Sequence, residues 1–217
     1  ELLRIAKDTP TPVSCTNVTD TSRLLEQVAF RGNLAMALYK VAFNKGAPGV
    51  DGKSVDEVVE NIHTLLPILQ QELLAGTYQP GDIRRVWIPK PGGGQRGLGI
   101  PNVIDRWVQQ ATLQVLEDIF EPTFHPSSHG FRRNRGAHTA IAEAKTYVAE
   151  GRAIVVDIDL SQFFDRVNHD SLMARVAAHR AKVKHRQRGA RIKPFAAVVE
   201  EAAERPRRGV DRQAVRE

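Results

Sequence analysis

The chain has little of the chemistry that builds cross-linked, metal-clustered or membrane-spanning proteins. Its 217 residues include a single cysteine, Cys15, which excludes a disulfide framework and a thiolate metal cluster. No apolar run approaches the roughly 20 residues of a membrane span, and no signal-peptide pattern opens the sequence. We therefore expect a cytoplasmic globular protein without a membrane partner, and 41% hydrophobic residues suffice for a core.

The excess of positive charge is confined to the C-terminal end. The formal net charge is +6, yet residues 177–217 hold 12 Lys or Arg against 5 Asp or Glu, and the rest holds 19 against 20. This basic tail has one aromatic residue, Phe195, and no apolar periodicity, so it predicts a disordered extension or out-of-frame translation. Any nucleic-acid interpretation of the body must rest on individually placed residues.

Helices dominate the expected architecture. Apolar residues at helical spacing predict helices that end at Asn44 and at Gly76, where a left-handed C-terminal residue is favoured. Ser54, followed three residues later by glutamate, predicts a capping box that opens a helix near Val55. The remaining helices are expected over residues 103–120, capped by Asn102, and over residues 137–149, ended by Gly151.

Two stretches instead have the composition of strands. Residues 84–89 and 96–100 flank a Pro-Gly-Gly-Gly sequence and predict a flexible β-hairpin. Residues 153–160 form a nearly continuous apolar run with aspartates near its far end, which predicts a buried sheet strand that delivers carboxylate to the edge. Asp170 is expected to cap the helix that follows, and both tryptophans, Trp87 and Trp107, are expected in the core.

Four stretches together resemble the group II intron-encoded reverse transcriptase/maturase family. Each is weakly specific alone, but the set occurs in the order and at the spacing of that family. The stretches are residues 44–52 (NKGAPGVDG), 88–101 (IPKPGGGQRGLGIP), 128–132 (SHGFR) and 157–169 (DIDLSQFFDRVNH). The Lys45-to-Gly52 stretch and the Gly-Phe-Arg loop favour group II introns over other reverse transcriptase lineages.

The resemblance implies an α+β fold: a fragment of a right-handed polymerase, helix-rich, with a β-hairpin in the fingers and an incomplete palm sheet. It implies two Mg²⁺ ions that stabilise the attacking and leaving oxygens of an in-line displacement, with an RNA template such as intron RNA, a DNA primer and deoxynucleotide triphosphates as partners. The catalytic residue that the resemblance implies is Asp159, which binds metal together with the Leu160 backbone. The implied nucleotide contacts are Lys90, Arg96, Ile158, Leu160 and Phe164. The implied contact with template or primer is Arg132.

The chemistry of these side chains fits the implied roles. Lys90 and Arg96 flank the glycine turn, where a point charge and a fork of donors can close over a triphosphate. Phe164 is expected to face the sugar and exclude a 2′-hydroxyl. Asp157 lies two positions before Asp159 and is left outside the catalytic set, since it can be satisfied structurally.

No Asp-Asp pair occurs in the sequence, whereas the family carries one in its second palm segment. We therefore expect a truncated or frameshifted reverse transcriptase that is inactive by itself, or alternatively a non-catalytic intron RNA-binding maturase remnant. His125, His129 and His138 do not indicate a zinc site, because no cysteine accompanies them. The expected domains are a flexible leader (1–21), fingers (22–150), the start of the palm (151–176) and the basic tail (177–217).

Overall fold

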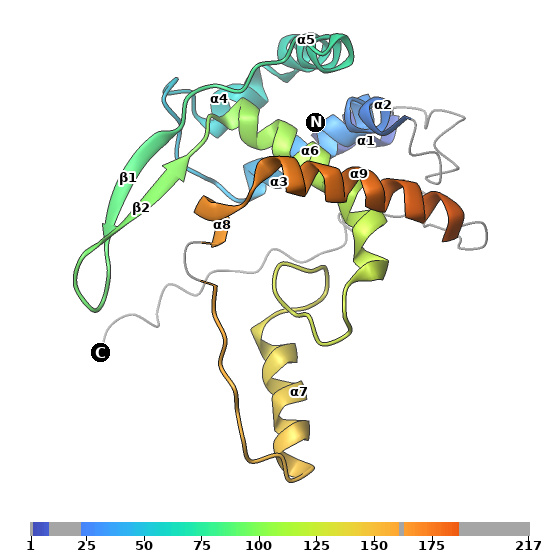
Figure 1. Ribbon diagram of the computed structural model, residues 1–217. Helices are drawn as coiled ribbons and strands as arrows, with labels where there is room; N and C mark the ends of the chain where they lie inside the picture. Colours follow the sequence, from blue (N-terminus) through green and yellow to red (C-terminus); the bar gives the residue numbers. More distant parts are fainter. Residues whose placement is uncertain (1, 9–22, 161–162, 187–217) are drawn as a thin grey trace. The chain divides into compact units, whose positions relative to one another are not determined.

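The computed structural model describes residues 2–8, 23–160 and 163–186. It divides into two compact units: the first includes the chain up to Val115, and the second covers Leu116–Arg188. Helix α6 runs from the first unit into the second (Figure 1). In chain order the elements are α1 (Leu2–Asp8), α2 (Leu24–Val28), α3 (Arg31–Phe43), α4 (Val55–Glu60), α5 (Ile62–Ala75), β1 (Arg84–Pro89), β2 (Gln95–Ile100), α6 (Val103–Phe120), the 3-10 turn η2 (Glu121–Thr123), α7 (Ala137–Ala149), α8 (Phe163–Arg166) and α9 (His169–Arg186).

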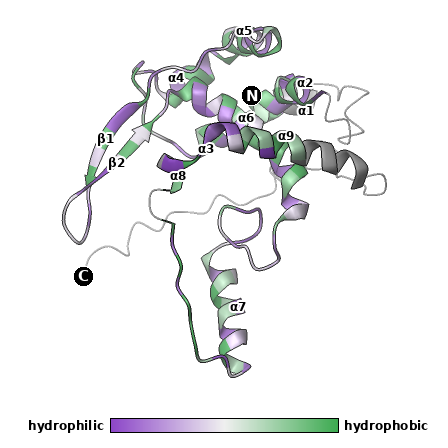
Figure 2. Ribbon diagram, in the orientation of Figure 1, coloured by the Kyte–Doolittle hydropathy of each residue, from purple (hydrophilic) through white to green (hydrophobic). Residues whose placement is uncertain are grey.

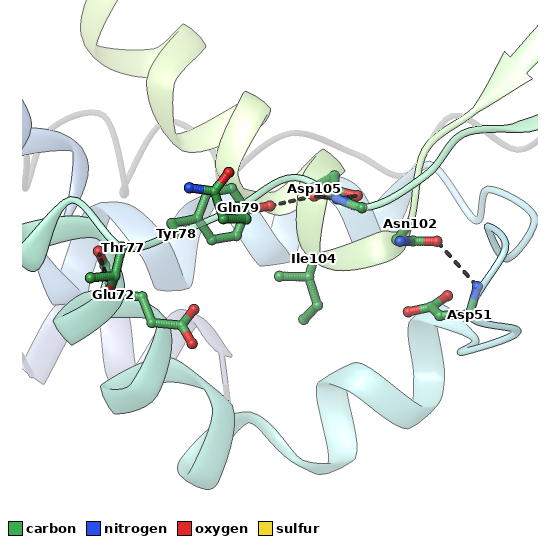
Figure 3. Close-up of a pocket in the computed structure, with 9 residues that line it drawn as sticks. Asp51, Glu72, Thr77, Tyr78, Gln79, Asn102, Ile104 and Asp105 are labelled. Atoms are coloured by element: carbon green, nitrogen blue, oxygen red, sulfur yellow. Dashed lines mark hydrogen bonds between the residues drawn. The ribbon is translucent and has the colours of Figure 1, made fainter.

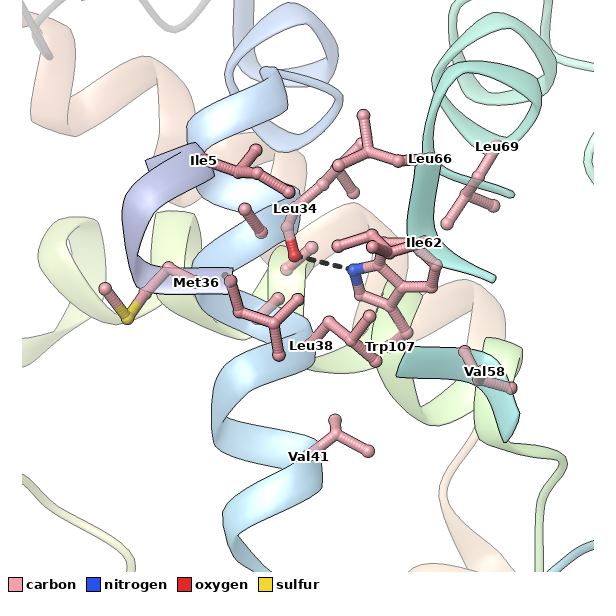
Figure 4. Packing of buried hydrophobic residues seen from close by; sticks show 14 of the residues in the cluster. Ile5, Leu34, Met36, Leu38, Val41, Val58, Ile62, Leu66, Leu69 and Trp107 are labelled. Carbon is pink, nitrogen blue, oxygen red and sulfur yellow. Dashed lines mark hydrogen bonds between the residues drawn. The ribbon is translucent and has the colours of Figure 1, made fainter. Parts of the chain in front are cut away.

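The core of the first unit is built around α3. Helix α3 is buried on all sides from Gly32 to Leu38, among α1, α4, α5 and the start of α6, and Trp107 of α6 lies at the centre of this core (Figure 4). The indole Nε1 of Trp107 donates a hydrogen bond of 2.7 Å to the carbonyl of Leu34, which satisfies the one polar atom of a side chain with no exposed surface. The expectation that Trp107 belongs to the core is confirmed.

A buried amide fixes the same helices from a second side. Asn33 of α3 donates from Nδ2 to the carbonyls of Val28 and Ala111, at 2.9 and 3.1 Å. Its own Oδ1 accepts 2.8 Å from Gln114 Nε2, so the amide is bonded on both sides. The hydrogen bonds of the Asn33 amide thus tie α2, α3 and α6 in one register, whereas Oε1 of its partner Gln114 is buried without a hydrogen-bond partner.

The predicted helix ends of the first unit are confirmed. Helix α3 stops before Asn44, and α5 ends at Gly76, whose φ of +69° is the left-handed conformation that glycine adopts without strain. Helix α4 begins at Val55 because the Ser54 hydroxyl accepts from the Glu57 N–H.

The predicted hairpin is also confirmed. Strands β1 and β2 pair antiparallel, with Trp87 opposite Gly97 and Ile88 opposite Arg96, and Figure 1 shows the hairpin extending away from the helices of its unit. At the tip, the Lys90 N–H donates to the Gly94 carbonyl at 3.0 Å. Gly93 and Gly94 both take positive φ there, which a residue with a side chain would adopt only with strain.

Three expectations about single residues are wrong. Trp87 is 57% exposed rather than in the core, because alternate residues of a two-stranded hairpin face solvent unless another layer covers them. The Asn102 carbonyl accepts from Arg106 as α6 begins, but its side chain binds residues 50 and 51 instead of capping the helix. Helix α9 is capped by Asn168, whose Oδ1 accepts from Ser171 at 2.8 Å, and Asp170 lies inside the first turn.

The second unit departs most from the expected palm. Helix α7 forms where predicted, but residues 152–160 have no regular secondary structure, and β1 and β2 make the only sheet in the described part of the chain. Ile154, Val155 and Ile158 are each more than 80% exposed, and hydrophobic residues colour much of this segment green in Figure 2. The predicted buried strand is therefore wrong here, because a strand needs hydrogen-bonding neighbours and none pairs with it.

Helix α9 also differs from the composition-based boundary. It continues through Arg186, ten residues past Val176, so helix replaces the disorder expected for residues 177–186. Good helix formers, mainly Ala, Lys and Arg, supply enough propensity for helix although the apolar period is lost. Residues 187–217, the leader residues 9–22 and residues 161–162 lie outside the described part of the chain.

Candidate functional site

The tip of the hairpin presents two cations on either side of a glycine turn. Lys90 ends the first arm and Arg96 lies in β2, and both are exposed. Within the described residues neither makes an ion pair with a carboxylate. Residues 84–100 contain four Lys or Arg and no Asp or Glu, so the hairpin is a locally cationic arm, whereas the rest of the chain up to Val115 holds 8 Lys or Arg against 11 Asp or Glu. Its charge and flexible turn suit a phosphate-bearing ligand.

The root of the hairpin is fastened to the turn formed by residues 45–52. Asn102 Oδ1 accepts from the Val50 N–H at 2.9 Å, and the Arg106 guanidinium donates to the Ala47 carbonyl at 2.7 Å. The fit depends on glycine, since a Cβ on Gly49 would lie 2.6 Å from the Asn102 backbone. Two of the four recognised stretches are thereby joined into one structural block.

A buried carboxylate anchors the approach to β1. Asp105 of α6, only 6% exposed, accepts hydrogen bonds from the Tyr78 hydroxyl and from the Gly81 N–H, the latter at 3.3 Å to each oxygen. Burial, and then the hydrogen bond to Asp105, raise the pKa of the Tyr78 phenol above its ordinary 10.0. Tyr78 therefore remains a neutral donor throughout the physiological range.

A surface pocket of about 390 Å³ opens beside this anchor (Figure 3). Its lining includes the carboxylates of Asp51, Glu72 and Asp105 and no Lys or Arg. Negative walls repel a triphosphate, so this pocket does not suit the nucleotide that the hairpin suits. In the first unit, the exposed cations of the hairpin, and not the carboxylates of this pocket, have charge complementary to a phosphate.

In the second unit, Arg132 organises the loop that contains it. Its guanidinium donates to Glu121 Oε1 through Nη2 at 2.7 Å and through Nε at 3.0 Å, and Nη1 donates to the carbonyls of His125 and Ser128. The hydrogen bond from Arg132 also holds the pKa of Glu121 below its ordinary 4.5. With its side chain 8% exposed, Arg132 holds the loop and presents no free guanidinium to a template in this conformation.

His129 links the same loop to α7. Its Nε2 lies 2.7 Å from Glu143 Oε2 and its Nδ1 lies 2.9 Å from Thr139 Oγ1. Hydrogen bonds from Ser127, Tyr147 and His129 lower the pKa of Glu143 to about 2. Loop and helix are thus held by a bonded network whose anion stays charged in neutral solution.

The aspartate segment is exposed and unpaired. Asp159 accepts the N–H of Leu160 on its own Oδ1 at 2.9 Å, a local turn-like contact, and Ile158 and Leu160 point to solvent. Phe164 lies in α8, but its side chain is outside the described part of the structure. Among the described residues, no group of three His, Cys, Asp or Glu side chains gathers to hold a metal ion. These residues alone do not fit a two-Mg²⁺ centre, which requires several converging carboxylates.

The structure brings together some predicted residues and not others. Lys90 and Arg96 flank one turn of the first unit, whereas Asp159, Ile158 and Leu160 belong to the second unit. Four residues whose side chains hold distant segments together were not predicted from the sequence: Asn102, Arg106, Asp105 and Glu143. A polar residue on the inner face of a predicted helix, such as Asp105, was the available signal. None of the described helices is long and apolar enough to cross a membrane.

The chain is similar to a known protein family and to several known proteins. A family model described as reverse transcriptase (RNA-dependent DNA polymerase) matches residues 88–204, more than half of the chain. Protein YkfC of Escherichia coli K12 is 43% identical over 161 residues, which are 71% of this chain and 42% of YkfC. The group II intron-encoded protein LtrA of Lactococcus lactis subsp. cremoris is 32% identical over 166 residues, 72% of this chain and 26% of LtrA.

A third relative is also named for an intron. The putative COX1/OXI3 intron 1 protein of Saccharomyces cerevisiae is 36% identical over 105 residues, 48% of this chain and 12% of that protein. The chain thus spans less than half the length of each of these relatives. Together with the ordered motifs, these matches show that the chain belongs to the reverse transcriptase (RNA-dependent DNA polymerase) family, among its group II intron-encoded members.

Proposed function

We propose that this chain is the nucleotide- and template-gripping part of a group II intron RNA-directed DNA polymerase. The observation that carries the proposal is the hairpin: two exposed cations, Lys90 and Arg96, flank a glycine turn on an arm without acidic residues. A deoxynucleotide triphosphate supplies the complementary charge, and a flexible turn lets the arm close over it. Its template would be an RNA such as the intron, and its primer DNA.

The second unit would contribute to the same reaction once more of the palm is present. Asp159 is then one metal-binding carboxylate, the Ile158 and Leu160 backbone contacts metal or triphosphate, and Phe164 excludes a 2′-hydroxyl. When bound, Mg²⁺ would stabilise charge on the reacting phosphoryl oxygens. Arg132 would reach template or primer only by exchanging its present bonds, so we assign it first to holding the loop.

The polypeptide of 217 residues does not polymerise DNA by itself in this proposal. It has no Asp-Asp pair, and its described carboxylates form no metal-binding group. The measurement is incorporation of labelled deoxynucleotide on a primed RNA in the presence of Mg²⁺. We expect none above background, and template-dependent extension by the purified chain would contradict this part of the proposal.

Nucleotide binding is tested separately from chemistry. Calorimetric titration of Mg²⁺·dATP into the full chain should give an affinity that falls about fivefold or more in Lys90→Ala and again in Arg96→Ala, as expected for lost charge-assisted hydrogen bonds. Lys145→Ala, which removes an exposed lysine from α7, is the matched control and should bind as the parent does. Equal affinities in all four proteins would refute the role of the hairpin.

A second candidate is a non-catalytic RNA-binding or maturase remnant. The absence of a gathered carboxylate group in the described residues favours it. In that case intron RNA binds, the affinity for dATP is undetectable, and the Lys90 and Arg96 variants weaken RNA binding alone. Measuring the affinity for RNA over a series of salt concentrations distinguishes a defined binding surface on the body of the protein from nonspecific attraction by the basic tail. If the tail is responsible, deleting residues 177–217 removes the steep salt dependence; if the body is responsible, the salt dependence remains.

A further inference from the structure

Trp87 is an aromatic side chain that the fold leaves uncovered. It lies in the middle of β1 and is 57% exposed, whereas the other tryptophan of the chain, Trp107, has no exposed surface. Leaving an indole in water forgoes the free energy that burial of its apolar surface would contribute. Trp87 is exposed on the same hairpin as Lys90 and Arg96, and its ring is complementary to a ligand with a flat apolar surface.

The immediate surroundings of Trp87 form a flat, cationic platform. The residue opposite it is Gly97, so close beneath the ring that a Cβ there would lie 3.1 Å from Cζ3. Arg85, two residues earlier and therefore on the same strand face, places its guanidinium carbon 5.9 Å from the ring centroid. Opposite Arg85 stands Gly99, and the exposed Ile83 side chain lies against it, so this face holds an indole ring, a guanidinium and an apolar side chain over two glycines.

The charge of the hairpin selects among possible occupants. With four cations and no acidic residue in residues 84–100, the arm attracts a polyanion and disfavours the mixed-charge surface of most proteins. Single-stranded nucleic acid combines a charged backbone with unpaired flat bases. Proteins bind it with basic grooves and with aromatic rings on which bases stack.

We propose that Trp87 stacks on a nucleobase of single-stranded RNA laid along the Gly97 face of the hairpin, with Arg85 at a neighbouring phosphate. This rests on the proposed function only in taking the hairpin to be a nucleic-acid surface. It adds a base-stacking residue to the cations Lys90 and Arg96. The hairpin would then bind the RNA strand as well as the nucleotide triphosphate.

The two tryptophans make the test direct. A 12-residue oligoadenylate is titrated into the full chain while indole fluorescence is followed, and Trp107, buried in the core, serves as the internal reference. Stacking should quench the solvent-exposed, red-shifted part of the emission, which comes from Trp87. In Trp87→Leu the quenching should vanish and the affinity should fall about fivefold or more, while Trp87→Phe keeps a ring and most of the affinity.

The matched control is another exposed aromatic residue with an arginine at its ring. Tyr147 of α7 has Arg152 4.7 Å from its centroid, but its neighbours include acidic Glu143 and Glu150. Tyr147→Leu should leave oligoadenylate binding unchanged. An equal loss in Tyr147→Leu, or wild-type affinity and quenching that does not depend on residue 87, would overturn the proposal.

The two proposals fail separately. If Trp87→Leu binds oligoadenylate as the parent does while Lys90→Ala and Arg96→Ala still weaken dATP binding, stacking is wrong and nucleotide gripping stands. If the Lys90 and Arg96 variants bind dATP normally while Trp87→Leu loses RNA, the reverse holds. Far-UV circular dichroism of Trp87→Leu verifies the fold, and Gly97→Val, which lifts the ring from its seat without removing it, should weaken the quenching in the same direction.

Discussion

The anchor between Asp105, Tyr78 and Gly81 leads to the most quantitative prediction. Asp105→Asn keeps the size of the side chain but removes its charge and replaces one acceptor oxygen with a donor. Hydrogen bonds to charged groups contribute about 1.5–3 kcal/mol each, and the bond from the half-buried Tyr78 hydroxyl belongs to this class. The Gly81 N–H, exposed and at 3.3 Å, is partly replaced by water and adds about 0.5–1 kcal/mol. We expect a total loss of about 2–4 kcal/mol.

The assay is equilibrium unfolding in urea, followed by circular dichroism and by the emission of Trp107. Glu60→Gln, which neutralises an exposed carboxylate at the end of α4, is the control and should change the free energy of unfolding by less than about 0.5 kcal/mol. Tyr78→Phe removes the same bond from the other side. The double variant should therefore be less destabilised than the sum of the single variants by about 1–2 kcal/mol.

Two results would refute this reasoning. Asp105→Asn within about 0.5 kcal/mol of the parent would mean that the buried carboxylate contributes no net stability, because its desolvation offsets its bonds. Strict additivity with Tyr78→Phe would mean that the two groups are not coupled. Either result would remove the anchor as an explanation for how the hairpin is held.

Three further predictions concern the core, the second loop and the turn. Trp107→Ala should destabilise the first unit by about 3–5 kcal/mol in urea unfolding, since it empties the centre of the core and leaves the Leu34 carbonyl without its hydrogen-bond donor. Because the pKa of Glu143 is lowered from 4.5 to about 2, its contribution to stability is present above pH 4.5 and is lost as the pH falls toward 2. Amide hydrogen exchange in the loop at 122–136 should therefore accelerate over this pH range in the parent and not in Glu143→Gln. Gly49→Ala should destabilise by about 1–3 kcal/mol through its clash with Asn102, whereas Gly92→Ala, whose Cβ would meet no atom, should be nearly neutral by the same unfolding assay.

Local signals in the sequence were sufficient for most of the secondary structure. Ser54 as a cap, Gly76 as a left-handed end and the Pro-Gly-Gly-Gly turn each act over a few residues, so their effects can be predicted without knowing the tertiary fold. Trp107 could be placed in the core because its helix has a continuous apolar stripe. The same reasoning failed for Trp87, since a hairpin has no inherent inside until another layer covers one face.

Contacts between distant segments were beyond sequence reasoning. Asn102 looked like an ordinary helix cap, yet its side chain binds a turn some 50 residues earlier. Arg132 looked free for a template, yet its donors are consumed by Glu121 and two loop carbonyls. Residues 153–160 have the composition of a central strand, but strand formation depends on neighbours, and no segment in the described part of the chain pairs with them.

The close packing of the turn formed by residues 45–52 against α6 also limits which substitutions the two segments can accept. Gly46 lies where a Cβ would meet the Arg106 guanidinium, and Gly49 lies against the Asn102 backbone. A larger residue at position 46 becomes acceptable only if the Arg106 side chain moves or is replaced by a shorter one. Either change would remove the hydrogen bond from Arg106 to the Ala47 carbonyl. Among homologues, positions 46 and 106 should therefore vary as a pair, while position 49, packed on main chain that no substitution can trim, should stay glycine.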